Sequence, residues 1–299
     1  MVSWWAAGGL SDPGIRVLNG SPVVPFRSPE RCAEALQALV AYSRHAECGQ
    51  GTDTKSQTQG DPKRLKEAAQ LLNTGEASLS EHESKTLLKL YGIPVTRDKI
   101  VRSVDDAVQF AGQIGYPVAL KIDSPDILHK TEADVIRLGI GSKEDLVKSY
   151  GEIMDAATRY DPGARINGVA VQEMVTGGTE VITGMSQDQQ FGPTIAFGLG
   201  GIFVEVLKDI SLRVTPLSKS DAQNMVREIK GYPILKGIRG KAPADIDAVV
   251  DLLQKLSRLV EDFKKDIAEI DINPLLVFNQ GQGVKALDAL VVLKNKSKE

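Results

Sequence analysis

The sequence has few cysteines and no long apolar stretch. Its two cysteines, Cys32 and Cys48, do not form a Cys-x-x-Cys pair, so neither a disulfide framework nor a zinc site is indicated. No uncharged apolar run approaches the roughly 20 residues that a membrane span needs. The N-terminus also shows no basic region followed by a long apolar stretch. We therefore predict a cytoplasmic protein with no membrane partner.

The sequence also lacks an excess of either charge. Its 36 lysines and arginines and its 39 aspartates and glutamates are interspersed and give a net charge of −3. Nucleic acids and anionic membranes attract basic patches, so neither is an expected partner. With 299 residues, 42% of them hydrophobic, the chain is long enough for two domains or one large domain. We expect its partners to be small molecules or proteins.

The first part of the chain has the composition of a fragment of an α/β domain. Apolar segments at 15–18 and 22–25 precede a helix that begins with Ser28 and Pro29. This is about one strand and one helix, which is too small to fold alone. The predicted division is residues 1–45 as the end of a larger domain, 46–78 as a linker and connector helix, and 79–299 as a second domain.

Residues 79–175 are predicted to form a lobe of alternating helices and strands. Ser80 and Glu83 form a capping box that starts a helix ending near Tyr91. The elements that follow are a strand at 98–101, a helix from 103, strands from 118 and at 135–140, a helix from 142, and a strand at 168–174. This order is similar to that of β–α–β units.

Residues 176–299 are richer in strands. The predicted elements are strands at 180–185, 194–197 and 203–207, helices at 221–229 and 244–263, and a closing β-hairpin of 267–278 and 284–293. Residues 198–201, Gly-Leu-Gly-Gly, either bring backbone N–H groups to phosphates or form a tight turn, and the pattern does not decide between them. The cations Lys208, Arg213 and Arg239 could neutralise phosphoryl oxygens, although each alone is more typical of a surface residue.

A loop that carries charged and nucleophilic side chains follows the apolar run at 117–122. The run delivers Lys121 to a loop that contains His129, Lys130 and Glu132. A single histidine in a polar loop is most often a solvated surface residue. A lysine at the end of a buried strand, followed by such a loop, instead favours a phosphate-binding ammonium beside a nucleophile.

Oxygen-bearing side chains gather on the closing hairpin. Glu269, Asp271 and Asn273 alternate along one predicted strand and therefore point to the same face, and Asp288 lies in the predicted partner strand. A solvated sheet face is the alternative interpretation. Because neighbouring carboxylates repel one another and Mg²⁺ prefers oxygen ligands, we favour a magnesium site.

Several segments in order along residues 80–293 carry a family resemblance. They are 91–94, Lys121 with 124–132, 172–174, 197–201, 205–209 and 269–275. Together they resemble the ATP-grasp domain of the ADP-forming acyl-CoA synthetases, a family related to succinyl-CoA synthetase. Residues 1–45 are similar to the end of the CoA-ligase domain that precedes this domain in fused members. The resemblance implies an α/β (α+β) fold, in which a CoA-ligase remnant precedes a two-lobed ATP-grasp domain with lobes 79–175 and 176–299.

The resemblance also implies a role for individual residues. The implied nucleotide-binding residues are Lys121 at the phosphates, Glu173, Met174 and Val175 at the adenine hinge, and Glu180 near the ribose; we add Arg213. The implied metal ligands are Asn273 and Asp288, with Asp271 and Glu269 close by. His129 would accept the phosphoryl group from ATP. The implied cofactors are ATP or ADP and Mg²⁺, with CoA bound only by an absent domain or partner chain.

The resulting hypothesis is a nucleotide-binding component of an ADP-forming acyl-CoA synthetase that acts through a phosphohistidine relay. It would need a CoA-binding domain or subunit, in a hetero- or homo-oligomer. The alternatives are an ATP-grasp ligase that phosphorylates a carboxylate directly, and a non-catalytic nucleotide-binding fragment. One departure concerns 133–135, Ala-Asp-Val, where relatives commonly have a Gly-Gly pair. The backbone there is expected to have less freedom to let the histidine loop move.

Overall fold

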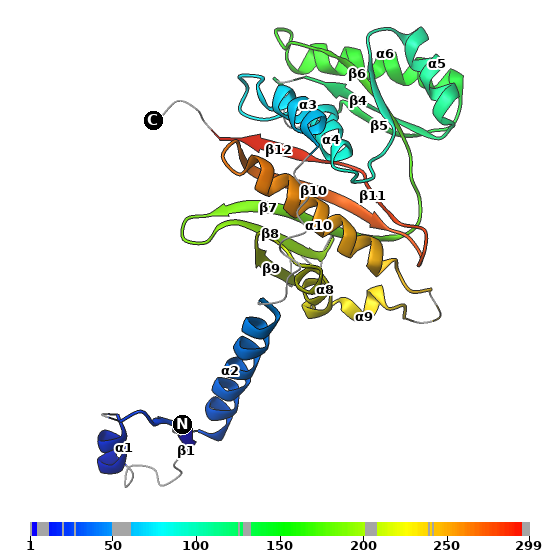
Figure 1. Cartoon of the computed structure of the whole chain (residues 1–299). Helices are drawn as coiled ribbons and strands as arrows, with labels where there is room; N and C mark the ends of the chain where they lie inside the picture. Colours follow the sequence, from blue (N-terminus) through cyan, green and yellow to red (C-terminus); the bar gives the residue numbers. More distant parts are fainter. Residues whose placement is uncertain are drawn as a thin grey trace. The chain divides into compact units, whose positions relative to one another are not determined.

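A computed structural model describes residues 2–4, 12–19, 21–26, 28–49, 61–124, 126–127, 133–200, 208–238, 240 and 242–294. The chain divides into two compact units, residues 1–59 and 60–299. Figure 1 shows the helices and strands of both units, coloured along the sequence.

The first unit contains two short parallel strands and two helices. The elements are β1 (Val2–Trp4), α1 (Asp12–Leu18), β2 (Val24–Phe26) and α2 (Pro29–Gly49). The apolar segment at 15–18 is therefore helical, and the helix predicted after Ser28 continues to Gly49, past the predicted start of the linker. Among the side chains described in this unit, only Ile15 is buried.

The second unit begins with two helices that pack into its core. They are α3 (Pro62–Leu72) and α4 (Glu81–Leu90). The predicted capping box of Ser80 and Glu83 is present at the start of α4. Ala68 and Leu72 of α3 belong to the same hydrophobic cluster as the second sheet, so this helix is an integral part of the unit.

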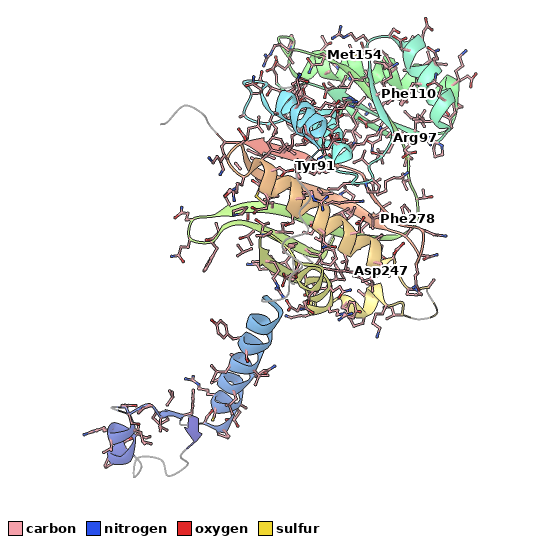
Figure 2. The ribbon with its side chains drawn as sticks, in the orientation of Figure 1. Tyr91, Arg97, Phe110, Met154, Asp247 and Phe278 are labelled. Atoms are coloured by element: carbon pink, nitrogen blue, oxygen red, sulfur yellow. The ribbon has the colours of Figure 1, made fainter. Side chains whose placement is uncertain are left out.

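The first sheet of this unit is antiparallel throughout. Its strands are β3 (Asp98–Val101), β4 (Val118–Asp123), β5 (Ile136–Ile140) and β6 (Gly168–Glu173), in the order β3-β6-β4-β5. The helices α5 (Val104–Ile114) and α6 (Lys143–Tyr160) pack against it, with Phe110 and Met154 at the edge of this core (Figure 2). The predicted β–α–β order is split, because β6 lies between β3 and β4.

The second sheet has six strands. They are β7 (Thr179–Asp188), β8 (Gly192–Leu199), β9 (Ile210–Val214), β10 (Ile267–Val277), β11 (Val284–Ala286) and β12 (Leu290–Leu293). The order is β11-β10-β7-β8-β9, and β12 also pairs with β10. Three helices lie beside this sheet, α8 (Lys219–Glu228), α9 (Tyr232–Leu235) and α10 (Ile246–Phe263) (Figure 1). The α+β fold class is thus confirmed.

Two predictions for this lobe were wrong in detail. The predicted strand at 284–293 is two strands, and Asp288 lies in the segment between β11 and β12. Strand β8 extends to Leu199, so Gly198 lies in a strand and not in a loop. The predicted strand at 203–207 and Gly201 lie outside the described residues. Among the residues that the structure describes, no helix combines the length and the hydrophobicity that a membrane span requires.

Candidate nucleotide and metal site

Lys121 lies on β4 and meets carboxylates from two other elements. Its Nζ donates a hydrogen bond to Glu81 Oε1 on α4 at 2.8 Å and lies 3.6 Å from Asp288 Oδ2. Burial lowers the pKa of Lys121, but the charges of Glu81 and Asp288 outweigh burial and raise it. The side chain therefore stays a cation. The structure thus brings the predicted phosphate-binding lysine to one of the predicted metal ligands.

The predicted alternation of oxygen-bearing and apolar side chains is present on β10. Glu269, Asp271 and Asn273 are exposed, and they alternate with the buried Ile270 and Ile272. The alternation follows the period of two of a strand with one face on a core.

The charges on this face suit a cation. The Asp271 side chain reaches water, but its partial burial raises its pKa, and the charges of Glu269 and Asp288 raise it further. Within the described residues, no three carboxylate, histidine or cysteine side chains converge on one point. The donors that Glu269, Asp271, Asn273 and Asp288 offer are hard oxygen atoms. They fit Mg²⁺, which is commonly held by one or two carboxylates together with phosphate oxygens and waters.

The predicted adenine hinge is held by ionic and sulfur contacts. Glu173 is buried and accepts hydrogen bonds from Arg97 N at 3.0 Å, Arg97 Nε at 2.7 Å and Lys285 Nζ at 2.9 Å (Figure 2 labels Arg97). Burial raises the pKa of Glu173, but the bonds from Lys285 and Arg97 outweigh burial and lower it. Met174 Sδ accepts from Gly139 N at 2.8 Å, and Val175 is half-buried just after β6. The Glu173 carboxylate is therefore occupied in joining β6 to β11.

The other predicted nucleotide-binding residues lie on separate strands of the second sheet. Glu180 is exposed on β7 and is paired in register with Leu276 of β10. Arg213 lies on the edge strand β9, with β7 and β8 between it and β10, and forms an ion pair with Glu228 of α8. The structure does not bring Arg213 to Lys121 and Asp288. His129 and Lys130 lie outside the described residues.

Sequence reasoning assigned no role to Glu81, which contacts Lys121, or to Lys85, which contacts Glu81. Lys85 is buried and donates to Glu81 Oε1 at 2.7 Å and to Gln172 Oε1 at 3.0 Å. Gln172 in turn donates to Leu287 O at 3.1 Å, next to Asp288. The available signal was the spacing of Lys85 on α4, since it shares the buried face of the helix with Leu88.

Comparison with known proteins identifies the fold. The model of a family described as ATP-grasp domain matches residues 70–293. The chain is 48% identical over 230 residues to the acetate–CoA ligase [ADP-forming] II subunit beta of Pyrococcus furiosus, covering 77% of this chain and 98% of that subunit. It is 42% identical over 283 residues to acetate–CoA ligase [ADP-forming] I of Archaeoglobus fulgidus, covering 95% of this chain but only 41% of that protein.

Solved structures agree with this assignment. The dinucleotide-forming acetyl-coenzyme A synthetase 1 of Ca. Korarchaeum cryptofilum, in complex with coenzyme A and Ca-AMPCP, superposes with a TM-score of 0.71 at 42% identity, covering 78% of this chain and 99% of that one. Another structure of that protein contains Mg-AMPPCP, with its phosphohistidine segment pointing towards the nucleotide binding site. Its TM-score is 0.66 at 39% identity, with the same coverage of both chains. The chain therefore belongs to the ATP-grasp family of the ADP-forming acyl-CoA synthetases.

Proposed function

We propose that this chain is the nucleotide-binding component of an ADP-forming acyl-CoA synthetase. The reaction interconverts an acyl-CoA, ADP and phosphate with a free acid, CoA and ATP. The observation that carries the proposal is the 3.6 Å approach of Lys121 Nζ, on β4 of the first sheet, to Asp288 Oδ2, in the segment between β11 and β12. In sites that bind a metal–nucleotide complex, the phosphates contact both a cationic side chain and a metal ion that carboxylates hold, so these two protein groups lie close together.

The chain's own residues would act mainly by binding the phosphates and the metal ion and by offsetting negative charge. The ammonium of Lys121 binds phosphate oxygens and offsets their negative charge as it shifts during transfer. Asn273 and Asp288 would hold Mg²⁺, with Asp271 and Glu269 beside them. When bound, the ion neutralises phosphate charge and orients the phosphates. Glu173 would act on the hinge indirectly, through its fixed bonds to Arg97 and Lys285.

His129 is the proposed phosphoryl carrier. In the direction that makes ATP, a β-phosphate oxygen of ADP attacks the phosphorus of phosphohistidine, the P–N bond breaks, and the imidazole regains a proton. In reverse, an imidazole nitrogen attacks the γ-phosphorus of ATP and ADP leaves. The sequence motif 129–132 supports this role, and so does the phosphohistidine segment of the related synthetase.

The first unit supports a proposal about the partner. The alignment with the longer Archaeoglobus ligase covers 95% of this chain. Because residues 1–59 make up far more than the remaining 5%, the alignment includes most of them. We therefore propose that this unit is the end of a CoA-ligase-like α/β domain. The CoA-binding part would belong to the same enzyme, as a further domain or a second subunit, and the enzyme would work in the cytoplasm. The acid is not assigned, because its recognition would reside mostly in that part.

A labelling experiment tests the relay. The full chain is incubated with γ-labelled ATP and Mg²⁺, and the expected product is protein with an acid-labile, base-stable label. His129→Ala should abolish the label. His82→Gln is the matched control, because His82 is tied to Asp98 by a 2.7 Å hydrogen bond and should leave the label intact.

Other results would replace the proposal. Wild-type protein that binds ATP but stays unlabelled, while forming ADP from ATP, a carboxylate and an amine, would identify a direct carboxylate ligase. Nucleotide binding without turnover, even with a CoA-binding partner supplied, would identify a non-catalytic module.

A further inference from the structure

Two residues hold the chain shortly after it leaves β4. The Asp126 carboxylate accepts three hydrogen bonds from Arg165, which come from the backbone N at 2.7 Å, from Nε at 3.0 Å and from Nη2 at 2.8 Å. These bonds lower the pKa of Asp126 to about 2, so its carboxylate is charged at neutral pH. Ile127 is 1% exposed and belongs to the hydrophobic core of the first sheet. Arg165 lies between α6 and β6, so the contact joins segments that are far apart in the sequence.

A second ion pair holds the chain where it returns to the sheet. Asp134 has a φ of 55°, in the left-handed region that favours glycine. Its carboxylate accepts hydrogen bonds from Arg137 Nη1 at 2.8 Å and Nη2 at 3.1 Å. Ala133 and Val135 are buried in the same core as Ile127. The residues on both sides of 128–132 are therefore fixed to one core.

Covalent geometry limits where His129 can lie while these contacts hold. His129 follows Ile127 by two residues and precedes Ala133 by four. Since an extended chain spans about 3.3–3.6 Å per residue, the His129 Cα lies within about 7 Å of the Ile127 Cα and within about 14 Å of the Ala133 Cα. The connection to Ile127 is the shorter tether, and it sets the limit.

We infer that Arg165 is a positioning residue for His129, because it holds Asp126 and with it the shorter tether. The tether keeps the imidazole near the end of β4, the strand that carries Lys121. Holding two reacting groups close together raises the rate of their reaction without any new contact to the nucleotide. The inference rests on the proposed function, because it takes His129 to accept the phosphoryl group of ATP.

The step that Arg165 assists is the attack of an imidazole nitrogen on the γ-phosphorus of ATP. An N–P bond forms, the bond from the γ-phosphorus to the bridging oxygen breaks, and ADP leaves with that electron pair. The other ring nitrogen gives its proton to water. Arg165 contacts none of the reacting atoms in this inference, so its removal should change the rate of transfer and not the affinity for nucleotide.

The experiment follows single-turnover labelling of the full chain by γ-labelled ATP and Mg²⁺, and calorimetry measures its affinity for ADP and Mg²⁺. Arg165→Gln removes the two side-chain bonds to Asp126, and Asp126→Ala removes all three. We expect labelling to slow about tenfold in Arg165→Gln and further in Asp126→Ala, with unchanged affinity for ADP. The double variant should label at the rate of Asp126→Ala, because both changes remove the same contact.

Arg137→Gln is the matched control. It removes the other Arg–Asp pair beside this segment, on the side where the tether to His129 is longer, so labelling should keep the wild-type rate. If circular dichroism shows that Asp126→Ala is unfolded, the milder Asp126→Asn takes its place in the series.

The possible results separate the inference from the proposed function. Labelling of Arg165→Gln at the wild-type rate overturns the inference, and so does equal slowing in Arg165→Gln and Arg137→Gln. A fall in ADP affinity that accounts for the slower labelling also overturns it, because the contact would then support the fold and not the position of His129. A wild type that binds ADP but takes up no label overturns the proposed function instead.

Discussion

Glu173→Gln should destabilise the second unit in a pH-dependent way. The wild-type carboxylate is buried and accepts three hydrogen bonds, from Arg97 N, Arg97 Nε and Lys285 Nζ. Hydrogen bonds to a charged group each contribute about 1.5–3 kcal/mol. The Arg97 side chain is largely exposed, so water screens its bond to Glu173 and that bond contributes less. Glutamine retains an acceptor and loses the charge. We expect a loss of about 2 kcal/mol, or about 4–8 °C in Tm.

The sign of the pH effect follows from the lowered pKa of Glu173. A carboxyl group with a lowered pKa stabilises the fold fully above its unfolded-state pKa of about 4.3, and this stabilisation is lost as pH falls through the lower folded-state value. The wild type and Glu173→Gln should therefore differ at pH 7 and converge in acid. Urea unfolding followed by circular dichroism at about pH 7 and about pH 3.5 measures both differences.

The matched control for this experiment is Glu152→Gln. Glu152 pairs with Arg137 and Lys148, but its side chain is 43% exposed, so its loss should cost less than about 1 kcal/mol. Equal stability of wild type and Glu173→Gln at pH 7 would refute the reasoning. A difference that stays constant down to pH 3.5 would also refute it, because the charge would then not be its source.

Two further predictions concern the metal face. Asp288→Asn removes a carboxylate whose Oδ2 lies 3.6 Å from Lys121 Nζ. In the wild type the charge of this carboxylate raises the pKa of Asp271. The Mg²⁺ concentration needed for half-maximal nucleotide binding should rise about tenfold, as for a loss of about 1.4 kcal/mol, and an unchanged Mg²⁺ titration would contradict the proposed ligand. Gly184→Ala places a Cβ against the backbone oxygen of Ile270, beside Asp271, and should cost about 1–3 kcal/mol of unfolding free energy in a urea titration. Ser186→Ala, on the same strand and exposed, is its control.

Local signals in the sequence predicted most elements and the composition of the metal face. The capping box at Ser80 and the alternation from Glu269 to Asn273 are patterns of neighbouring residues, and the structure contains both. The order of the first sheet could not be predicted, because alternation tells which face a side chain occupies and not which strand lies beside it. The structure places β6 between β3 and β4, a neighbour relation between segments far apart in the sequence.

Two site features could not be predicted for different reasons. The spacing of Lys85 marks the buried face of α4, but lysine is rarely buried, and its contact with Gln172 on β6 depends on how distant segments pack. The closing hairpin reads as continuous because 284–293 is apolar almost throughout. In the structure the backbone of Leu287 bonds instead with Pro274 and the Gln172 side chain, which ends the strand and places Asp288 beside Lys121.

The burial of the described side chains of the first unit has a consequence for thermal measurements. Cooperative melting requires many side chains that lose their contacts together, and among the side chains described in residues 1–59 only Ile15 is sequestered from water. This segment on its own should contribute no sharp heat-absorption peak. A calorimetric transition recorded for the whole chain would then report on residues 60–299. A second peak that arises when a CoA-binding partner is added would show that the segment has acquired a core.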